Sequence, residues 1–145
     1  MGRWLWIGVA GALAAGVPAA AQPGPGYQIA LPERLEIEAG QGEAVSLTIA
    51  PASGHVISRT GPLRVSLAAT PAEGLDLPRQ RYKRAQAADR LADAPRFDLA
   101  VRGVRAGRYQ LAVDILFWLC RGRVCRPIRA ERAVEVQVRA APAPS

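Results

Sequence analysis

Cys120 and Cys125 are the residues whose type and spacing best suit a chemical role, because two close thiols can form a disulfide bond. They are the only cysteines of the chain. Four residues separate them, and Gly122 among these favours a β-hairpin turn. Apolar, β-like runs lie on both sides, at Tyr109–Leu119 and Ile128–Val138. Cysteines at the two strand ends would face each other closely enough to bond. The sequence therefore predicts one hairpin disulfide, or one dithiol, and no other thiol.

The first residues of the chain indicate the compartment in which this pair would work. Arg3 provides a short positive region, and Leu5–Val17 is an apolar stretch of 13 residues. Ala19–Ala21 provides the small residues that a signal peptidase recognises. The apolar stretch is too short to cross a bilayer core, which takes about 20 helical residues. We therefore expect a cleaved signal peptide at residues 1–21.

The expected domain organisation follows from this cleavage. The mature chain fits a single domain, which we place at residues 22–139, followed by a disordered tail at 140–145. An uncleaved N-terminal anchor with Trp4 and Trp6 at the membrane interface is the alternative. Export predicts a periplasmic or secreted protein, and disulfide bonds persist in such compartments.

Apolar residues alternate with polar ones along most of the mature chain, whereas helical periodicity is nearly absent. In Arg96–Arg102 the residues between the apolar positions are mostly charged, which predicts one face in the core and one in water. Short strands separated by Gly- and Pro-rich turns are typical of an all-β fold, an immunoglobulin-like β-sandwich. The clearest alternating segments are Leu35–Ile37, Val45–Ile49, Leu63–Leu67, Phe97–Val101, Tyr109–Phe117 and Val134–Val138.

Two segments refine this prediction. Arg79–Ala94 is rich in alanine and charge, so a loop, a short helix and an irregular strand all stay open there. Tyr109 follows Gly107 at a strand entry of the kind that contains a tyrosine corner in immunoglobulin-like folds, where the hydroxyl bonds back to the backbone. Tyr109 would then mark the penultimate strand, with the cysteine hairpin at one end of the sandwich. The alternative is an ordinary half-buried strand aromatic.

An exported sandwich with a close cysteine pair in a late hairpin, followed by Pro127 and a valine-rich last strand, resembles the N-terminal periplasmic domain of the thiol:disulfide interchange protein DsbD. The specific part of the resemblance is Trp118–Pro127. It implies that Cys120 and Cys125 are the catalytic redox pair and that a protein redox partner exchanges electrons with them. It also implies contact with the membrane only through a separate partner protein.

Arginines surround the cysteine pair in sequence, at Arg121, Arg123 and Arg126. Nearby guanidinium charge favours the thiolate form of a cysteine and so makes a disulfide easier to reduce. Arginines on an exposed hairpin also protect an edge strand from aggregation. We therefore expect an exported thiol-disulfide interchange domain. The alternative is a non-catalytic secreted binding or accessory module with a structural hairpin disulfide.

The charge balance limits the other function classes. The formal net charge is +7, with a concentration at Arg79–Arg84. A solvated face is the default interpretation of this charge, and contact with an anionic surface or an acidic protein surface is the alternative. Nucleic acid is a poor candidate because no binding motif accompanies the charge in an exported chain. A lone His55 and two cysteines do not form a zinc site, so no metal or cofactor is expected. No motif of a hydrolase or transferase is present.

Overall fold

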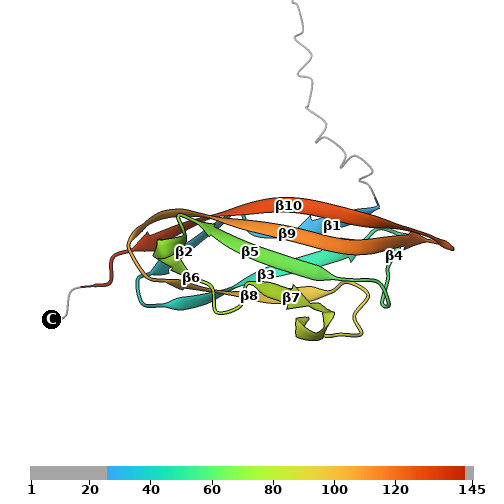
Figure 1. Cartoon of the computed structure of the whole chain (residues 1–145), viewed down its shortest axis with the longest axis horizontal. Coiled ribbons are helices and arrows are strands. Elements are labelled where there is room, and N and C mark those ends of the chain that lie inside the picture. Colours follow the sequence, from blue (N-terminus) through green and yellow to red (C-terminus); the bar gives the residue numbers. More distant parts are fainter. Residues whose placement is uncertain (1–25, 143–145) are drawn as a thin grey trace, which may run out of the picture.

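The computed structural model of the protein describes residues 26–142, which form two β-sheets packed face to face (Figure 1). The predicted signal peptide at 1–21 and the last residues of the predicted tail lie outside this range. The strands are β1 (Tyr27–Ala30), β2 (Arg34–Glu38), β3 (Gly42–Pro51), β4 (Val56–Ile57), β5 (Arg64–Thr70), β6 (Leu75–Asp76), β7 (Arg81–Lys83), β8 (Arg96–Gly103), β9 (Gly107–Arg121) and β10 (Val124–Arg139), and the short 3₁₀ helices are η1 (Ala72–Gly74) and η2 (Arg84–Gln86).

The strand order is that of an immunoglobulin-like sandwich, as predicted. One sheet has the order β1-β3-β8-β6, which corresponds to strands A, B, E and D of that fold. The other has the order β2-β10-β9-β5-β7, in which β10, β9 and β5 correspond to strands G, F and C. Strand β2 pairs in parallel with the end of β10, and β4 pairs with the far end of β9.

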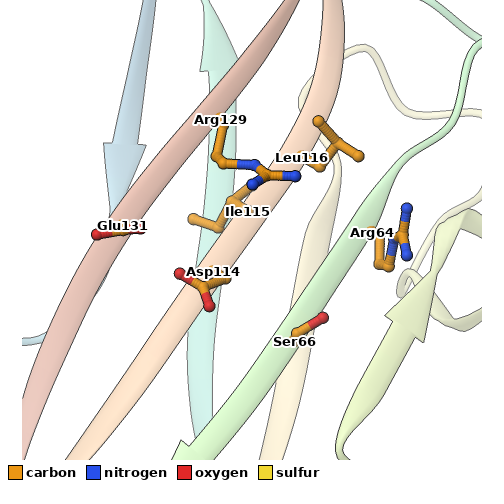
Figure 2. A pocket seen from close by; sticks show the side chains of 7 residues that line it. All are labelled: Arg64, Ser66, Asp114, Ile115, Leu116, Arg129 and Glu131. Carbon is orange, nitrogen blue, oxygen red and sulfur yellow. The ribbon is translucent and has the colours of Figure 1, made fainter.

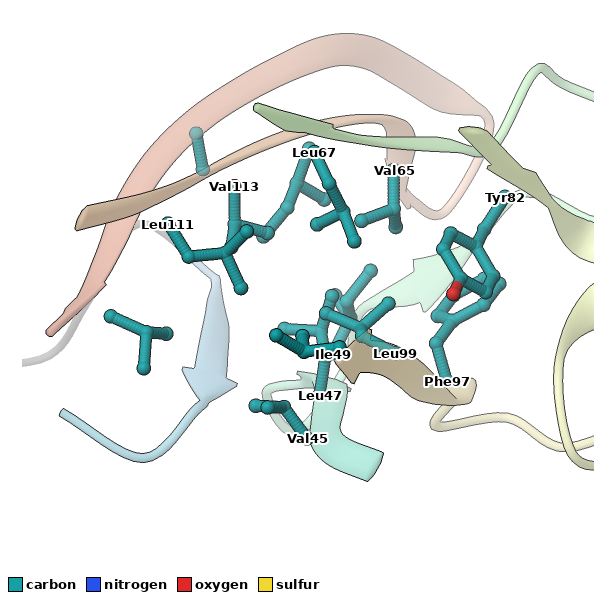
Figure 3. Packing of buried hydrophobic residues seen from close by; sticks show 14 of the residues in the cluster. Val45, Leu47, Ile49, Val65, Leu67, Tyr82, Phe97, Leu99, Leu111 and Val113 are labelled. Atoms are coloured by element: carbon teal, nitrogen blue, oxygen red, sulfur yellow. The ribbon is translucent and has the colours of Figure 1, made fainter. Parts of the chain in front are cut away.

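The core lies between the two sheets and is built by period-two alternation. Along β9, the odd-numbered residues from Leu111 to Leu119 are buried, so the even-numbered residues face outward. No polar or charged side chain between residues 26 and 142 is fully buried. Figure 3 shows side chains of both sheets meeting, among them Val45, Leu47, Ile49, Val65, Leu67, Phe97, Leu99, Leu111 and Val113.

Tyr109 forms the predicted tyrosine corner. Its side chain is 8% exposed, and its hydroxyl donates a hydrogen bond of 2.7 Å to the backbone carbonyl of Arg105. The bond closes the turn between β8 and β9, which is the place of this motif in immunoglobulin-like domains. Gly74 lies against the tyrosine ring, and its carbonyl accepts a backbone hydrogen bond of 3.0 Å from Val104.

The cysteine hairpin is tighter than the sequence indicated. Because β9 continues to Arg121 and β10 begins at Val124, only Gly122 and Arg123 form the turn. Gly122 has a φ of +60°, which fits the first turn position of a two-residue hairpin. The cysteines lie near the strand ends, as predicted, but each strand continues one residue past its cysteine, so the turn has two residues instead of four. This part of the hairpin extends beyond the core, so its residues do not alternate in hydrophobicity.

The segment Arg79–Ala94 contains both a short strand, β7, and the 3₁₀ turn η2. Tyr82 anchors it, because this side chain is 4% exposed and its hydroxyl accepts a hydrogen bond of 3.0 Å from the backbone N–H of Ala100. The strands β1, β4, β6 and β7 were absent from the alternating segments predicted above. Each has two to four residues, which is too short for alternation to identify.

Candidate functional site

A disulfide bond joins Cys120 of β9 to Cys125 of β10. Of the two predicted states, a hairpin disulfide and a dithiol, the structure contains the disulfide. The two residues are directly opposite each other in the strand register, with Cα atoms 3.9 Å apart. The β9–β10 hairpin reaches one end of the molecule, opposite the end at which β9 begins and β10 finishes (Figure 1). The structure therefore places the bond in the terminal part of the hairpin, away from the centre of the sandwich.

The bond lies on the outer face of its sheet. Leu119 is 1% exposed and faces the core, so its neighbour Cys120 faces outward with Cys125. Cys120 is half-buried, whereas Cys125 is exposed. The difference has a topological cause, because Cys120 lies between β10 and β4, where Val56 is its partner. Around Cys125, β10 pairs only with β9, so Cys125 is the more exposed residue of the two.

The three neighbouring arginines are exposed, but two of them lie on the other face of the hairpin. Arg121 and Arg126 follow the cysteines in their strands, and consecutive strand residues point to opposite faces. Both arginines accordingly line a hollow of about 370 Å³ together with His55 and the inward-facing Leu119. The alternation of side chains therefore directs Arg121 and Arg126 to the face opposite the cysteines.

His55 belongs to the turn between β3 and β4, and its Nδ1 lies 3.2 Å from the backbone carbonyl oxygen of Ser53. Within residues 26–142 no group of three or more His, Cys, Asp or Glu side chains is arranged to hold a metal ion. The same residues contain no helix with the length and apolar character needed to cross a membrane.

A second hollow lies on the outer face of the same sheet, toward the middle of the strands (Figure 2). Register places Arg64, Leu116 and Arg129 in one row across β5, β9 and β10. The next row contains Ser66, Asp114 and Glu131. The ion pairs found between residues 26 and 142 are Arg34–Glu135, Arg59–Asp93 and Arg96–Asp98, so none of them joins these rows. Sequence reasoning missed this hollow because it depends on the register of three strands.

We expect the replacement of both cysteines by serine to leave the fold intact. The bond closes a loop of about six residues, for which the chain-entropy model gives about 2 kcal/mol of stability. A loss of this size lowers the melting temperature by roughly 5–10 °C in a domain of this length. Thermal melting followed by circular dichroism measures the shift for C120S/C125S against the oxidised protein. An unfolded double variant would contradict the expectation and make the bond essential for folding.

Comparison with known proteins gives no family for the chain, since neither a protein-family model nor a curated protein matches it. The resemblance to the DsbD domain therefore stays a prediction. The disulfide agrees with an exported protein, because such bonds persist mainly in oxidising compartments.

Several solved structures resemble the chain at low identity. Murine CRIg is 9% identical with a TM-score of 0.40, covering 78% of this chain and 98% of its own. The CooA pilin subunit from enterotoxigenic Escherichia coli is 12% identical with a TM-score of 0.36, and the match covers 81% of this chain and 100% of the pilin chain. AggA, the major subunit of aggregative adherence fimbriae type I from Escherichia coli, is 7% identical with a TM-score of 0.34, covering 78% and 93%. Nothing about the activity of this chain follows from these likenesses.

Proposed function

We propose that the protein is a periplasmic thiol-disulfide interchange domain that exchanges electrons with partner proteins through Cys120 and Cys125. The observation that supports this best is the exposure of the disulfide on the outer face of a terminal hairpin. Exchange begins when a thiolate attacks one sulfur of a disulfide, so the bond must be reachable by a partner. The core packing between the sheets does not involve this bond.

The unequal exposure of the two cysteines supports different roles for them in the proposed reaction. A partner thiolate attacks the sulfur of Cys125, the Cys120–Cys125 bond breaks, and Cys120 leaves as a thiolate that takes a proton from water. A second partner thiolate then attacks the partner sulfur of the mixed disulfide and releases Cys125. The partner dithiol is thereby oxidised, and the cysteine pair is reduced by two electrons. In the opposite direction, Cys125 attacks a partner disulfide and Cys120 resolves the mixed disulfide.

Apolar residues beside the bond provide a surface for protein contact. Val56 is 53% exposed, and it lies on the same face as Cys120 because the next residue, Ile57, is buried. Pro127 is exposed on this face and is opposite the half-buried Trp118. A partner that covers these residues would exclude water from the reacting sulfur atoms. This surface fits a protein better than a small thiol.

A non-catalytic binding or accessory module is the second candidate function. Two directly opposed cysteines beside a two-residue turn also form a local brace for the hairpin. The hollow in Figure 2 favours this candidate, because it presents Arg64, Arg129, Asp114 and Glu131 without an ion pair among them. A protein partner with complementary charges would pair with these side chains.

The reduction potential of the Cys120–Cys125 bond separates the two functions. For an interchange domain we expect a value in or above the range of about −270 to −120 mV spanned by exchange proteins. A structural brace lies below about −300 mV and resists glutathione. Equilibration of the purified protein in glutathione and dithiothreitol buffers, followed by thiol counting, measures this value.

Trapping with single-cysteine variants tests the assigned roles. C120S retains the exposed Cys125 and should accumulate mixed disulfides with partner proteins in the periplasm, because the resolving thiol is absent. C125S retains the half-buried Cys120 and should accumulate several-fold fewer. Non-reducing electrophoresis of both variants, expressed at equal levels, shows the adducts. A potential below about −300 mV, or no adduct with C120S, excludes the proposed exchange and favours the accessory module.

A further inference from the structure

A groove of about 540 Å³ runs along the β5–β7 edge of the second sheet, and its charged lining residues are all cations. They are Arg64, Arg81, Lys83 and Arg84. The other lining residues are Pro62, Leu63 and Ala85, so no carboxylate lines this cationic groove.

The strand register holds the cations of the groove close together. Arg64 of β5 is directly opposite Lys83 of β7. Directly opposed side chains have Cβ atoms about 5 Å apart, and like charges at such positions destabilise a sheet. Tyr82 points into the core, so Arg81 and Lys83 on either side of it face outward together. The fold thus maintains a repulsive arrangement that a bound anion would relieve.

Arg84 adds a positive charge that the protein solvates incompletely. Its Nη2 donates a hydrogen bond of 2.8 Å to the backbone carbonyl of Ser58, which fixes the half-buried guanidinium. Its Nε is buried without a hydrogen-bond partner. Burial lowers the pKa of Arg84 from its ordinary value, and the neighbouring charge of Arg59 lowers it further. Both effects disfavour the charged form of the Arg84 guanidinium.

Asp93, Asp114 and Glu131 do not line the cationic groove. Asp93 accepts a hydrogen bond of 2.9 Å from Arg59 and so does not pair with Arg84. Asp114 and Glu131 line the separate hollow of Figure 2, where Arg64 is the only groove residue. No ion pair found between residues 26 and 142 includes Arg81, Lys83 or Arg84.

We propose that the cationic groove binds a ligand with two or more phosphate groups. Phosphate oxygens accept charge-assisted hydrogen bonds from guanidinium and ammonium groups, and arginine binds phosphate with two parallel bonds. A multiply charged ligand offsets the repulsion among several cations, whereas a single weak anion offsets only part of it. A soluble condensed phosphate and the phosphate head groups of a membrane surface present the same chemistry. The proposal is independent of disulfide exchange, because the groove contains neither cysteine.

Calorimetric titration of the oxidised protein with tripolyphosphate tests whether the groove binds a soluble condensed phosphate. The test variant is R81Q/K83Q, which changes two exposed side chains of the groove. We expect its affinity for tripolyphosphate to fall about tenfold or more, because the variant removes two cations that form charge-assisted hydrogen bonds with phosphate oxygens. The control R102Q/R139Q removes the same charge from exposed positions on β8 and at the end of β10. The control should stay within about twofold of the wild type, because distant charges are screened by salt.

Sedimentation with vesicles tests whether the groove binds the phosphate head groups of a membrane surface. Vesicles of phosphatidylglycerol in phosphatidylcholine should bind the wild type and the R102Q/R139Q control but not R81Q/K83Q if the groove takes lipid phosphate. If the protein binds the vesicles but not tripolyphosphate, the ligand of the groove is the phosphate of lipid head groups. If it binds tripolyphosphate but not the vesicles, the ligand is a soluble condensed phosphate. Binding of neither probe overturns the proposal. Equal losses in the two double variants also overturn it, because net charge alone would then explain the binding. C120S/C125S should bind like the wild type, whatever the outcome for disulfide exchange.

Discussion

The substitution of Phe117 by alanine is expected to lower the free energy of unfolding by about 3–5 kcal/mol, the usual cost of removing a fully buried phenylalanine. Phe117 is 0% exposed and lies on β9, three residues before Cys120. Its ring meets the ring of Tyr27 edge-on, with centroids 5.2 Å apart. Since β1 forms backbone pairs only with β3, this contact links the first strand to the opposite sheet. The substitution would therefore leave a cavity and loosen the attachment of β1.

Urea unfolding followed by tryptophan fluorescence measures the effect of F117A. The matched control is L91A, because Leu91 is 73% exposed and its truncation should change stability by no more than about 0.5 kcal/mol. A loss below about 1 kcal/mol in F117A would mean that the neighbouring side chains refill the space. The packing that supports the β9 arm of the hairpin would then differ from that described above.

Replacing Gly74 by alanine should cost about 2–6 kcal/mol, because two effects add. A Cβ atom at this position would overlap the ring of Tyr109. The backbone of Gly74 is held by hydrogen bonds that its carbonyl accepts from Val104 and Arg105, so the tyrosine must move instead. Its movement breaks the hydroxyl bond to the Arg105 carbonyl and leaves a part-buried hydroxyl without its partner. Overpacking and the lost hydrogen bond each contribute about 1–3 kcal/mol.

Two further variants separate these effects. In G42A, the added methyl group would have only one heavy atom within 4 Å, the carbonyl oxygen of Val101 at 3.8 Å, so we expect a change below about 1 kcal/mol. Y109F removes the hydroxyl alone and should cost about 1–2 kcal/mol. Thermal unfolding of all three proteins compares them directly. If G74A were as stable as G42A, the tyrosine corner would tolerate a displaced ring, contrary to the packing in the structure.

The amino-acid sequence by itself determines the sandwich and the cysteine pair. The alternation from Leu111 to Leu119 specifies which side of β9 is buried, because successive side chains of a strand point to opposite faces. Cys120 and Cys125 are close in sequence, so a hairpin brings them together whatever the rest of the chain does. Tyr109 and its partner carbonyl at Arg105 are equally local. Local patterns of this kind are sufficient for the fold class and for the main candidate site.

Tertiary structure alone decided the features that depend on distant segments. Cys125 is the more exposed cysteine because β4, which is remote in sequence, pairs beside Cys120. Arg64 and Lys83 form one cationic groove only because β5 and β7 pair in a particular register, and a shift by one residue would move each side chain to the other face. Register between distant strands results from the packing of the whole core. No local pattern contains this information, so the groove and the unequal exposure of the two cysteines required the folded chain.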